Sequence, residues 1–348
     1  MLRIHLPAGR HWLQRALAPL AILIAAFTLV PLRADEKAAP ASTALAAKAA
    51  LTEPSVRCGP RAGDEWWLVD SRSLPDCGAA AEPSLAIFKY AEGAWQKATV
   101  AQLIKGQKKD TLTCFYVHGN RMESCDVVER GTQVYKALTK TDGTPVRNFR
   151  FVIYSWPSEQ EQGLVRDVRA KADRTDADSY YLAWLLAQFP KEGQLSVLGY
   201  SFGARIVTGA LHLRAGGSLD GHKLSTVPAD PLPVRVSFLA PAVHNYWILP
   251  GERNGQAVSQ IDRLFVGMNS CDPALQRYRF LDKCAKAEAL GYTGVVGVNQ
   301  LGTVGSTLVQ LDACCSNGRT HDELPYYASP NIVAELQRNL LWQPVSSR

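Results

Sequence analysis

Residues 195–203 read LSVLGYSFG, and this stretch decides the fold. Its first half is mostly apolar, as in a buried strand, and residues 202–213 continue with apolar side chains on one helical face. Gly199, Ser201 and Gly203 form a G-x-S-x-G motif at the junction. The backbone of a serine in such a turn is strained, and side chains two residues away would collide with their neighbours. This context predicts a nucleophile elbow with Ser201 at its tip.

Strands and helices alternate on either side of the elbow. Apolar runs predict further strands at residues 113–117, 149–156, 234–240, 264–268 and 308–311. Helices are predicted between and after them at residues 125–138, 158–189 and 331–341. Such an alternation is typical of an α/β fold, in which a mainly parallel sheet has helices on both faces.

The N-terminus resembles a secretory signal. Arg3, Arg10 and Arg15 precede an uncharged apolar run at residues 16–32, and the small Ala34 follows. We therefore expect residues 1–34 to be a signal peptide and the protein to be exported to the periplasm or beyond. The alternative is an uncleaved helix that anchors the chain to the inner membrane, which would be its only membrane contact.

Three further segments follow the signal. Residues 35–55 are rich in alanine and proline and are predicted to be a linker. Residues 56–111 contain short apolar runs separated by turn residues, which indicates a small β-rich N-terminal extension. Trp66 and Trp67 in that extension are expected to pack internally. Residues 112–348 then form the α/β domain.

Charge gives no support to nucleic-acid binding. The chain has 348 residues and a formal net charge of +6, but the first 34 residues hold four arginines and no acidic residue. Without those four charges the net charge falls to +2, so a nucleic-acid partner is not expected.

The chain contains eight cysteines, an even number that suits an oxidising compartment. The sequence suggests three local disulfides: Cys58–Cys77, Cys114–Cys125 and Cys271–Cys284. Cys314 and Cys315 are adjacent and could not easily bond to each other, so one of them is free to pair elsewhere. No cysteine or histidine pair has the spacing of a zinc site, and neither a metal nor a cofactor is expected.

A serine hydroxyl needs a base to remove its proton. In chains with a G-x-S-x-G nucleophile elbow, the serine comes first, the acid follows and the histidine base comes last. Position argues against five of the seven histidines: His5, His11, His118, His212 and His222. Of the remaining two, His321 lies in a loop after the last predicted strand and is the predicted base. His244 is expected to be a pocket residue or a satisfied surface histidine.

The acid should follow a strand end between the serine and the histidine. Asp272 follows the strand at 264–268, and the next residue is a proline that fixes the loop. Asp312, at the end of the last strand, is the rival candidate. Asp272 is the predicted acid.

An oxyanion hole needs two backbone N–H donors. The residue after the nucleophile, Phe202, supplies one. The second is expected from the loop after the first core strand, where Gly119 lets the backbone turn inward and the Asn120 N–H is the predicted donor. His118 is expected to brace this loop rather than to take part in catalysis.

Several segments together resemble a largely uncharacterised bacterial family of α/β-hydrolase-fold proteins: FYVHGN, YSWPS, GYSFG, NSCDPAL and GRTHDELPYY. The resemblance covers residues 112 to 342 and implies a triad of Ser201, Asp272 and His321. The chain departs from the family pattern at HGN, where an aromatic residue usually precedes the asparagine, so the second oxyanion donor is either Asn120 or Arg121.

These features predict a serine esterase that acts on a small or lipid-like acyl substrate through an acyl-enzyme. A lipase or an acyltransferase would use the same atoms, and a silent binding protein of the cell envelope is the rival class. The segment at residues 241–262 holds four apolar residues that either line an acyl pocket or pack internally: Tyr246, Trp247, Ile248 and Leu249.

Overall fold

The computed structural model describes residues 59–76, 82–141, 146–161, 163–281 and 285–343. All of these residues belong to one compact unit, Pro54–Arg348. The predicted signal peptide at residues 1–34 and the linker at 35–55 lie outside the described residues. Within the part of the chain that is described, no helix is both long and apolar enough to cross a membrane.

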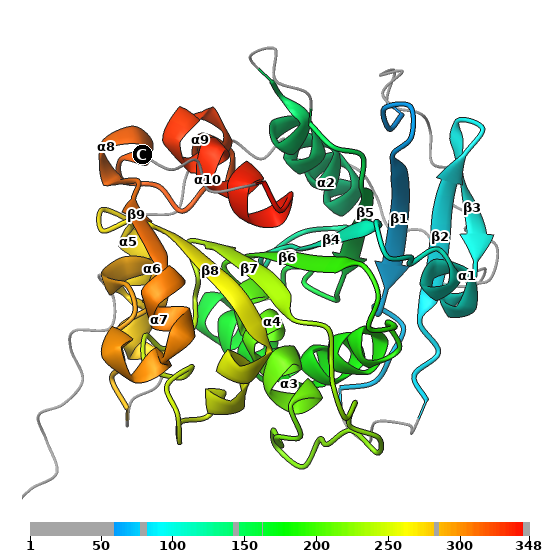
Figure 1. The fold of residues 1–348 in the computed structure, drawn as a ribbon. Coiled ribbons are helices and arrows are strands. Elements are labelled where there is room, and N and C mark those ends of the chain that lie inside the picture. The colour runs from blue at the N-terminus through cyan, green and yellow to red at the C-terminus, as the bar shows by residue number, and fades with distance from the viewer. Residues whose placement is uncertain (1–58, 77–81, 142–145, 162, 282–284, 344–348) are drawn as a thin grey trace, which may run out of the picture. The chain divides into compact units, whose positions relative to one another are not determined.

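One sheet runs through this unit in the order β3-β2-β1-β5-β4-β6-β7-β8-β9 (Figure 1). The strands are β1 Glu65–Asp70, β2 Ala86–Ala91, β3 Ala94–Ala98, β4 Leu112–Val117, β5 Arg150–Ser155, β6 Gln194–Tyr200, β7 Val234–Leu239, β8 Ile261–Met268 and β9 Val309–Asp312. From β1 to β9 every neighbouring pair is parallel, and β2 is antiparallel to both of its neighbours. The sheet is therefore mainly parallel, as predicted.

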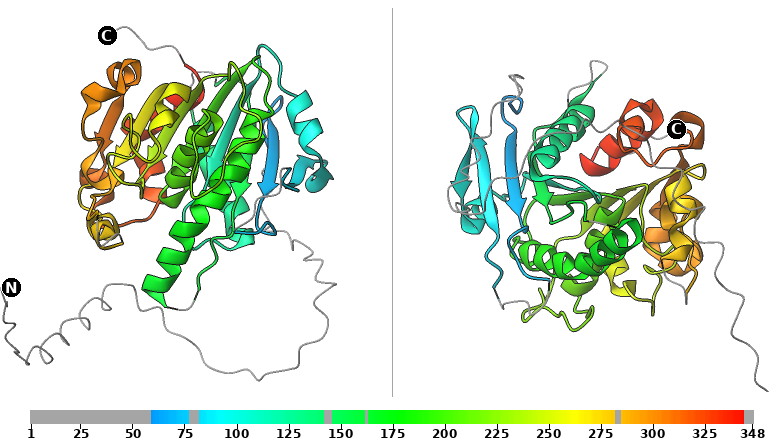
Figure 2. Two further views of the ribbon diagram at one scale, coloured as in Figure 1. Left: turned by 90° about the horizontal axis from the view of Figure 1, so that it is seen from below. Right: turned by 180° about the vertical axis from the view of Figure 1, so that it is seen from behind.

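Helices cover both faces of the sheet (Figures 1 and 2). Helices α2 (Ser124–Thr139) and α10 (Pro330–Leu340) lie on one face, and α3 (Leu164–Ala187) and α4 (Phe202–Arg214) lie on the other. Every residue of β4 and β5 is buried, because each strand is covered from both sides. The chain has the α/β-hydrolase fold that the sequence predicted.

Short helices fill the connections after β7 and β8 and around β9. They are η1 Gly255–Gln260, α5 Pro273–Gln276, η2 Tyr278–Phe280, α6 Leu290–Thr293, η3 Val298–Leu301, α7 Thr303–Thr307, α8 Cys314–Asn317 and α9 Leu324–Ala328. These connections matter because parallel strands end at one edge of a sheet. The loops that follow β4, β6, β8 and β9 therefore meet there.

The predicted N-terminal extension continues the main sheet. β1 pairs in parallel with β5, and β2 and β3 add to its outer side. Trp66 and Trp67 are buried. The Trp66 ring packs edge-to-face with the ring of Tyr135 from α2, and the two ring centroids are 5.0 Å apart. The last apolar run of the extension is divided: Trp95 lies in β3, whereas Val100 and Leu103 belong to a helix, α1 Val100–Lys105. Thr99 and Gln102 form a capping box that starts this helix.

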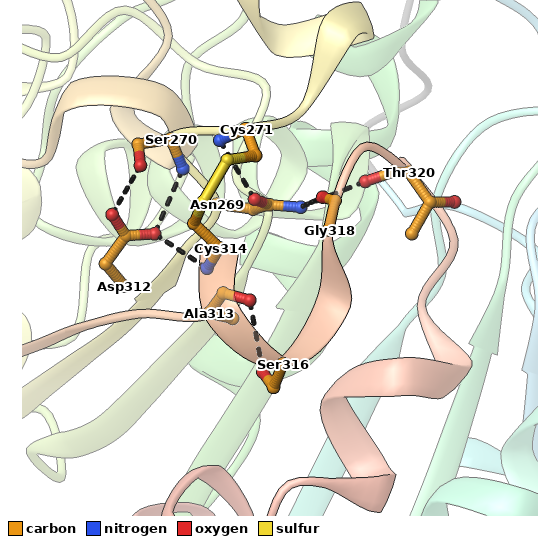
Figure 3. Close-up of a disulfide and its surroundings, with 9 residues drawn as sticks. All are labelled: Asn269, Ser270, Cys271, Asp312, Ala313, Cys314, Ser316, Gly318 and Thr320. Carbon is orange, nitrogen blue, oxygen red and sulfur yellow. Dashed lines mark hydrogen bonds between the residues drawn. A yellow bond between two sulfur atoms is a disulfide. The ribbon is translucent and has the colours of Figure 1, made fainter.

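Two of the three predicted disulfides are wrong. Cys271 bonds to Cys314 rather than to Cys284, across a sequence separation of 43 residues (Figure 3). β8 and β9 are neighbours, so the segments that follow them meet although they are distant in sequence. Cys114 is a free thiol buried in β4, whereas Cys125 is a free thiol exposed at the start of α2. The third predicted pair, Cys58–Cys77, lies outside the described residues.

Candidate active site

Ser201 occupies the turn between β6 and α4 and has φ 51° and ψ −118°, a conformation that few non-glycine residues adopt. Its flanking glycines make the turn possible. A Cβ atom on Gly203 would lie 2.1 Å from the carbonyl oxygen of Val117 in β4, and one on Gly199 would lie 3.0 Å from the backbone of Ala204. The backbone at the predicted elbow therefore has the required shape.

The predicted site residues Ser201, His321 and Asp272 lie in one chain of hydrogen bonds. Ser201 Oγ is 2.9 Å from His321 Nε2, and His321 Nδ1 is 2.6 Å from Asp272 Oδ2. An ionised carboxylate can only accept, so Nδ1–H donates to Asp272 and Nε2 is left to accept from the serine hydroxyl. This is the tautomer in which the imidazole can remove the serine proton.

Asp272 is fixed by its position as well as by the histidine. It lies at the N-cap of α5, where Oδ1 accepts from the N–H groups of Ala274 at 2.8 Å and Leu275 at 3.2 Å. Pro273 begins the helix behind it. Asp272 is fully buried, whereas the His321 side chain remains 29% exposed. The carboxylate is thus held rigidly while the imidazole stays open to a bound molecule.

The segment that carries His321 is tied to the sheet by buried polar groups. Tyr200, in β6 next to the serine, donates its hydroxyl proton to the His321 carbonyl oxygen. Two residues later the buried Glu323 accepts from Tyr116 of β4 at 2.9 Å and from Tyr327 of α9 at 2.5 Å. Burial raises the pKa of Glu323 to about 7, and Arg130 of α2 opposes that shift.

The loop after β4 passes directly beside Ser201. A Cβ atom on Gly119 would lie 3.2 Å from the Ser201 Cβ and 2.7 Å from the Tyr200 ring. The Arg121 N–H already donates to the carbonyl oxygen of Ser158 at 2.7 Å. This bond favours Asn120 over Arg121 as the second oxyanion donor.

Phe202 is the first residue of α4. A backbone N–H at that position has no carbonyl group one turn earlier with which to bond. It is therefore available to an oxyanion at the N-terminal end of the helix.

His118 braces the loop that contains Gly119. It is fully buried and stacks on Trp156, and its Nε2 accepts from the Trp156 backbone N–H at 3.1 Å. Nδ1–H therefore donates to the Gly119 carbonyl oxygen at 2.8 Å. Burial lowers the pKa of His118 to about 3, so the ring stays neutral. A neutral histidine with both ring nitrogens bonded fits the structural role expected from the sequence.

The rival residues have other partners. His244 is buried rather than on the surface, with Nδ1 2.9 Å from the Tyr278 hydroxyl and its ring stacked on Trp247 at 4.2 Å. Asp312 accepts from the backbone N–H groups of Ser270 at 3.1 Å and Cys314 at 3.0 Å. Asp312 therefore holds loops together, while Asp272 contacts the imidazole.

The four apolar residues of the 241–262 segment divide into two kinds. Ile248 and Leu249 are buried in the core. Tyr246 and Trp247 are only partly buried, and Trp247 lies under the guanidinium group of Arg205, 4.8 Å from the ring centroid. Arg205 belongs to the first turn of α4 and also lies 5.7 Å from the Phe202 ring. Trp247 is thus a partly buried aromatic residue that contacts the first turn of the elbow helix through Arg205.

Sequence reasoning missed three residues that support the site: Tyr200, Asn269 and Glu323. Each was part of a quoted motif, but each acts through a contact with a distant segment. The signal that could have found them is a polar residue within an apolar or catalytic motif. A tyrosine, asparagine or glutamate that is buried there requires a hydrogen-bond partner.

No protein-family profile and no curated protein matches the sequence. Among solved structures, the acyl-protein thioesterase 2 of Zea mays is similar at 16% identity and a TM-score of 0.38, with 67% of this chain and 95% of that chain covered. A C6-C4 SN3 inhibited esterase B from Lactobacillus rhamnosis is similar at 13% identity and a TM-score of 0.35, with 80% and 86% covered.

The same esterase B, inhibited by a C4-C4 SN3 tributyrin phosphonate, is similar at 11% identity and a TM-score of 0.34, with 80% and 85% covered. The fold of this chain is defined by its own sheet order rather than by these similarities. In the stretches of the chain that the structure describes, no group of three or more His, Cys, Asp or Glu side chains could hold a metal ion.

Proposed function

We propose that this protein is a serine hydrolase that cleaves carboxylic esters or related acyl bonds. Ser201 is the nucleophile, His321 the general base and Asp272 the acid that orients the imidazole. The observation that carries the proposal is the continuous chain of hydrogen bonds from Ser201 Oγ through His321 to Asp272. A strained serine at the start of a helix supports it further, since such a residue aims its hydroxyl at the ends of the strands.

The first half-reaction forms an acyl-enzyme. Ser201 Oγ bonds to the acyl carbon as its proton moves to His321 Nε2. The carbonyl oxygen becomes negative and accepts hydrogen bonds from the Phe202 and Asn120 N–H groups, each such donor being worth about 10² to 10³ in rate. The carbon–oxygen bond to the leaving alcohol then breaks, and Nε2 returns its proton to that alcohol.

The second half-reaction releases the acid. Water loses a proton to His321 Nε2 and bonds to the acyl carbon. The bond from that carbon to Ser201 Oγ then breaks, and Nε2 returns its proton to Ser201 Oγ, which restores the free enzyme. Asp272 keeps the Nδ1–H in place throughout, so that Nε2 faces the reacting atoms in both halves. An acceptor alcohol in place of water would give acyl transfer with the same residues.

Hydrolysis of p-nitrophenyl esters of increasing acyl length tests the proposal. We expect turnover by the wild type and a fall in kcat of about 10⁴-fold or more in Ser201→Ala and His321→Ala. Asp272→Asn should also lower kcat. Asp262→Asn is its control, because Asp262 lies at the start of β8, at the other end of the strand from Asp272, and pairs with Arg235 at 2.8 Å. Absence of turnover with every ester in a folded wild type would favour a silent binding protein of the same fold.

We also propose that the protein works in an exported, oxidising compartment. The Cys271–Cys314 disulfide supports this location, because disulfides persist in such compartments and are rare in the cytosol. Fractionation of cells that produce the full chain tests the location. Recovery of the protein only from the cytosol, with both thiols reduced, would refute it.

A further inference from the structure

Two loops meet beside the candidate site, and Asn269 lies where they touch (Figure 3). The acid loop, residues 269–272, follows β8 and ends at Asp272. The histidine loop, residues 313–321, follows β9 and ends at His321. Asn269 is the first residue of the acid loop and is fully buried.

The Asn269 side chain bonds to both loops at once. Its Nδ2 group donates to the carbonyl oxygens of Gly318 and Thr320, each at 3.0 Å, and its Oδ1 accepts from the Cys271 N–H at 3.0 Å. Carbonyl oxygens only accept and a backbone N–H only donates, so these partners fix the orientation of the amide. Figure 3 shows this side chain pointing from the acid loop to the histidine loop.

Two of the residues that Asn269 contacts are the immediate sequence neighbours of Asp272 and His321. Thr320 immediately precedes His321, and Cys271 immediately precedes Asp272. The Asn269 carbonyl oxygen also accepts from the Asp272 N–H at 3.1 Å. One buried side chain therefore sets the backbone on both sides of the 2.6 Å contact between the imidazole and the carboxylate.

We propose that Asn269 is a positioning residue that holds Asp272 and His321 in register. This inference rests on the proposed function, because register matters to catalysis only if the three side chains act together. A displacement of about 1 Å between groups aligned for reaction can cost about 10²-fold in rate.

One substitution removes the donor bonds of Asn269 with little change in side-chain shape. Asn269→Asp is nearly isosteric and keeps the acceptor for the Cys271 N–H, but it replaces the donor with an oxygen that faces two carbonyl oxygens. The Cys271–Cys314 disulfide and the bonds from Asp312 still join the same loops, so they support folding of the variant. Asn269→Ala removes the contacts without adding charge and serves as the second variant.

Asn339→Asp is the matched control. Asn339 is also fully buried, and its Nδ2 group donates to the Val236 carbonyl oxygen at 2.7 Å and to the Ser237 hydroxyl at 2.9 Å. Both of these partners belong to β7, and neither is part of the acid loop or the histidine loop. Asn269→Asp and Asn339→Asp thus both lose a buried amide donor, but only Asn269→Asp alters the loops that carry Asp272 and His321.

Three readouts on the folded proteins test the inference: kcat and KM on a p-nitrophenyl ester, the rate of fluorophosphonate labelling, and the low-field proton signal of the His321 Nδ1–H. We expect Asn269→Asp and Asn269→Ala to lower kcat and the labelling rate about 10²-fold, to leave KM unchanged and to lose the proton signal. Asn339→Asp should keep wild-type values in all three.

Wild-type kcat in both Asn269 variants would overturn the inference. An equal loss in Asn339→Asp, or failure of both Asn269 variants to fold while Asn339→Asp folds, would also overturn it, since the role would then be structural only. If the wild type itself shows no turnover and no labelling, the proposed function fails instead. The proton signal then still reports whether Asn269 sets the register.

Discussion

At the scale of single residues, the site depends on backbone positions that tolerate no side chain. Gly203 is the clearest case, because a Cβ atom there would lie 2.1 Å from the Val117 carbonyl oxygen and 2.8 Å from that of His118. Both neighbours are backbone atoms, one at the end of β4 and one in the loop that follows it and contains the proposed oxyanion donor Asn120. A methyl group at this position must therefore push α4 away from β4.

We predict that Gly203→Ala lowers the free energy of unfolding by about 2 kcal/mol and removes most of the proposed esterase activity. Denaturant unfolding and ester hydrolysis measure the two effects. Gly59→Ala is the control, because a Cβ atom there meets only the Tyr90 ring at an ordinary 3.4 Å. An active Gly203→Ala protein of wild-type stability would contradict the close packing at the elbow.

The residues that the sequence identified share a local signature. Ser201 lies in a motif with its own strand and helix, and chain order singled out His321 and Asp272, whose side chains the structure brings together. Asn269 and Glu323 could not be found in this way. Their roles depend on partners about 50 and 200 residues away, and a single sequence does not give those distances.

At the scale of elements, the Cys271–Cys314 disulfide joins the segments that follow two neighbouring strands. It closes a long loop, and closing a loop of this length removes entropy from the unfolded chain worth about 4 kcal/mol. The bond also connects the loops that carry Asp272 and His321.

We predict that the double variant Cys271→Ser with Cys314→Ser unfolds more easily by up to about 4 kcal/mol and has a lower kcat. Thermal melts with and without a thiol reductant measure the effect: the reductant should lower the melting temperature of the wild type and of Cys315→Ser, but not that of the double variant. Cys315→Ser, which alters the exposed free thiol next to the bond, is the control. Equal melting temperatures for the double variant and the wild type would refute the prediction.

The elements themselves were largely predictable, but their pairing was not. Periodicity located the strands and main helices of the α/β domain, because both depend on nearby residues. The disulfide was mispaired because Cys271 and Cys284 are close in sequence, whereas Cys271 and Cys314 become close only through the pairing of β8 with β9. The helix α1 was missed because the Thr99–Gln102 capping box was not recognised.

At the scale of the whole molecule, a buried acid links global stability to pH. Burial raises the pKa of Glu323 from its ordinary value of 4.5 to about 7, so the folded state binds a proton that the unfolded state releases. This proton stabilises the fold fully below pH 4.5, and its contribution is lost as pH rises through 7. The full contribution is on the order of 3 kcal/mol.

We predict that Glu323→Gln removes this part of the pH dependence. The free energy of unfolding of the wild type, relative to that of the variant, should fall as pH rises from 4.5 through 7. Urea unfolding of both proteins across that range is the measurement. Two parallel curves would show that Glu323 does not bind a proton on folding.

The sequence did not show that the N-terminal extension joins the main sheet, because strand pairing depends on residues that are distant in sequence. Its strands are short and separated by turns, as in an independent β unit, yet β1 pairs in parallel with β5 through residues more than 80 positions away. The composition of a segment does not reveal which strand it joins.

The central claim is that Ser201 is an activated nucleophile. Fluorophosphonate labelling of the purified protein, followed by mass spectrometry of its peptides, tests this claim most directly. We expect one adduct per chain, on Ser201, that is lost in Ser201→Ala and His321→Ala and slowed in Asp272→Asn. A folded wild type that takes up no probe, or that carries the adduct on another residue, would contradict it.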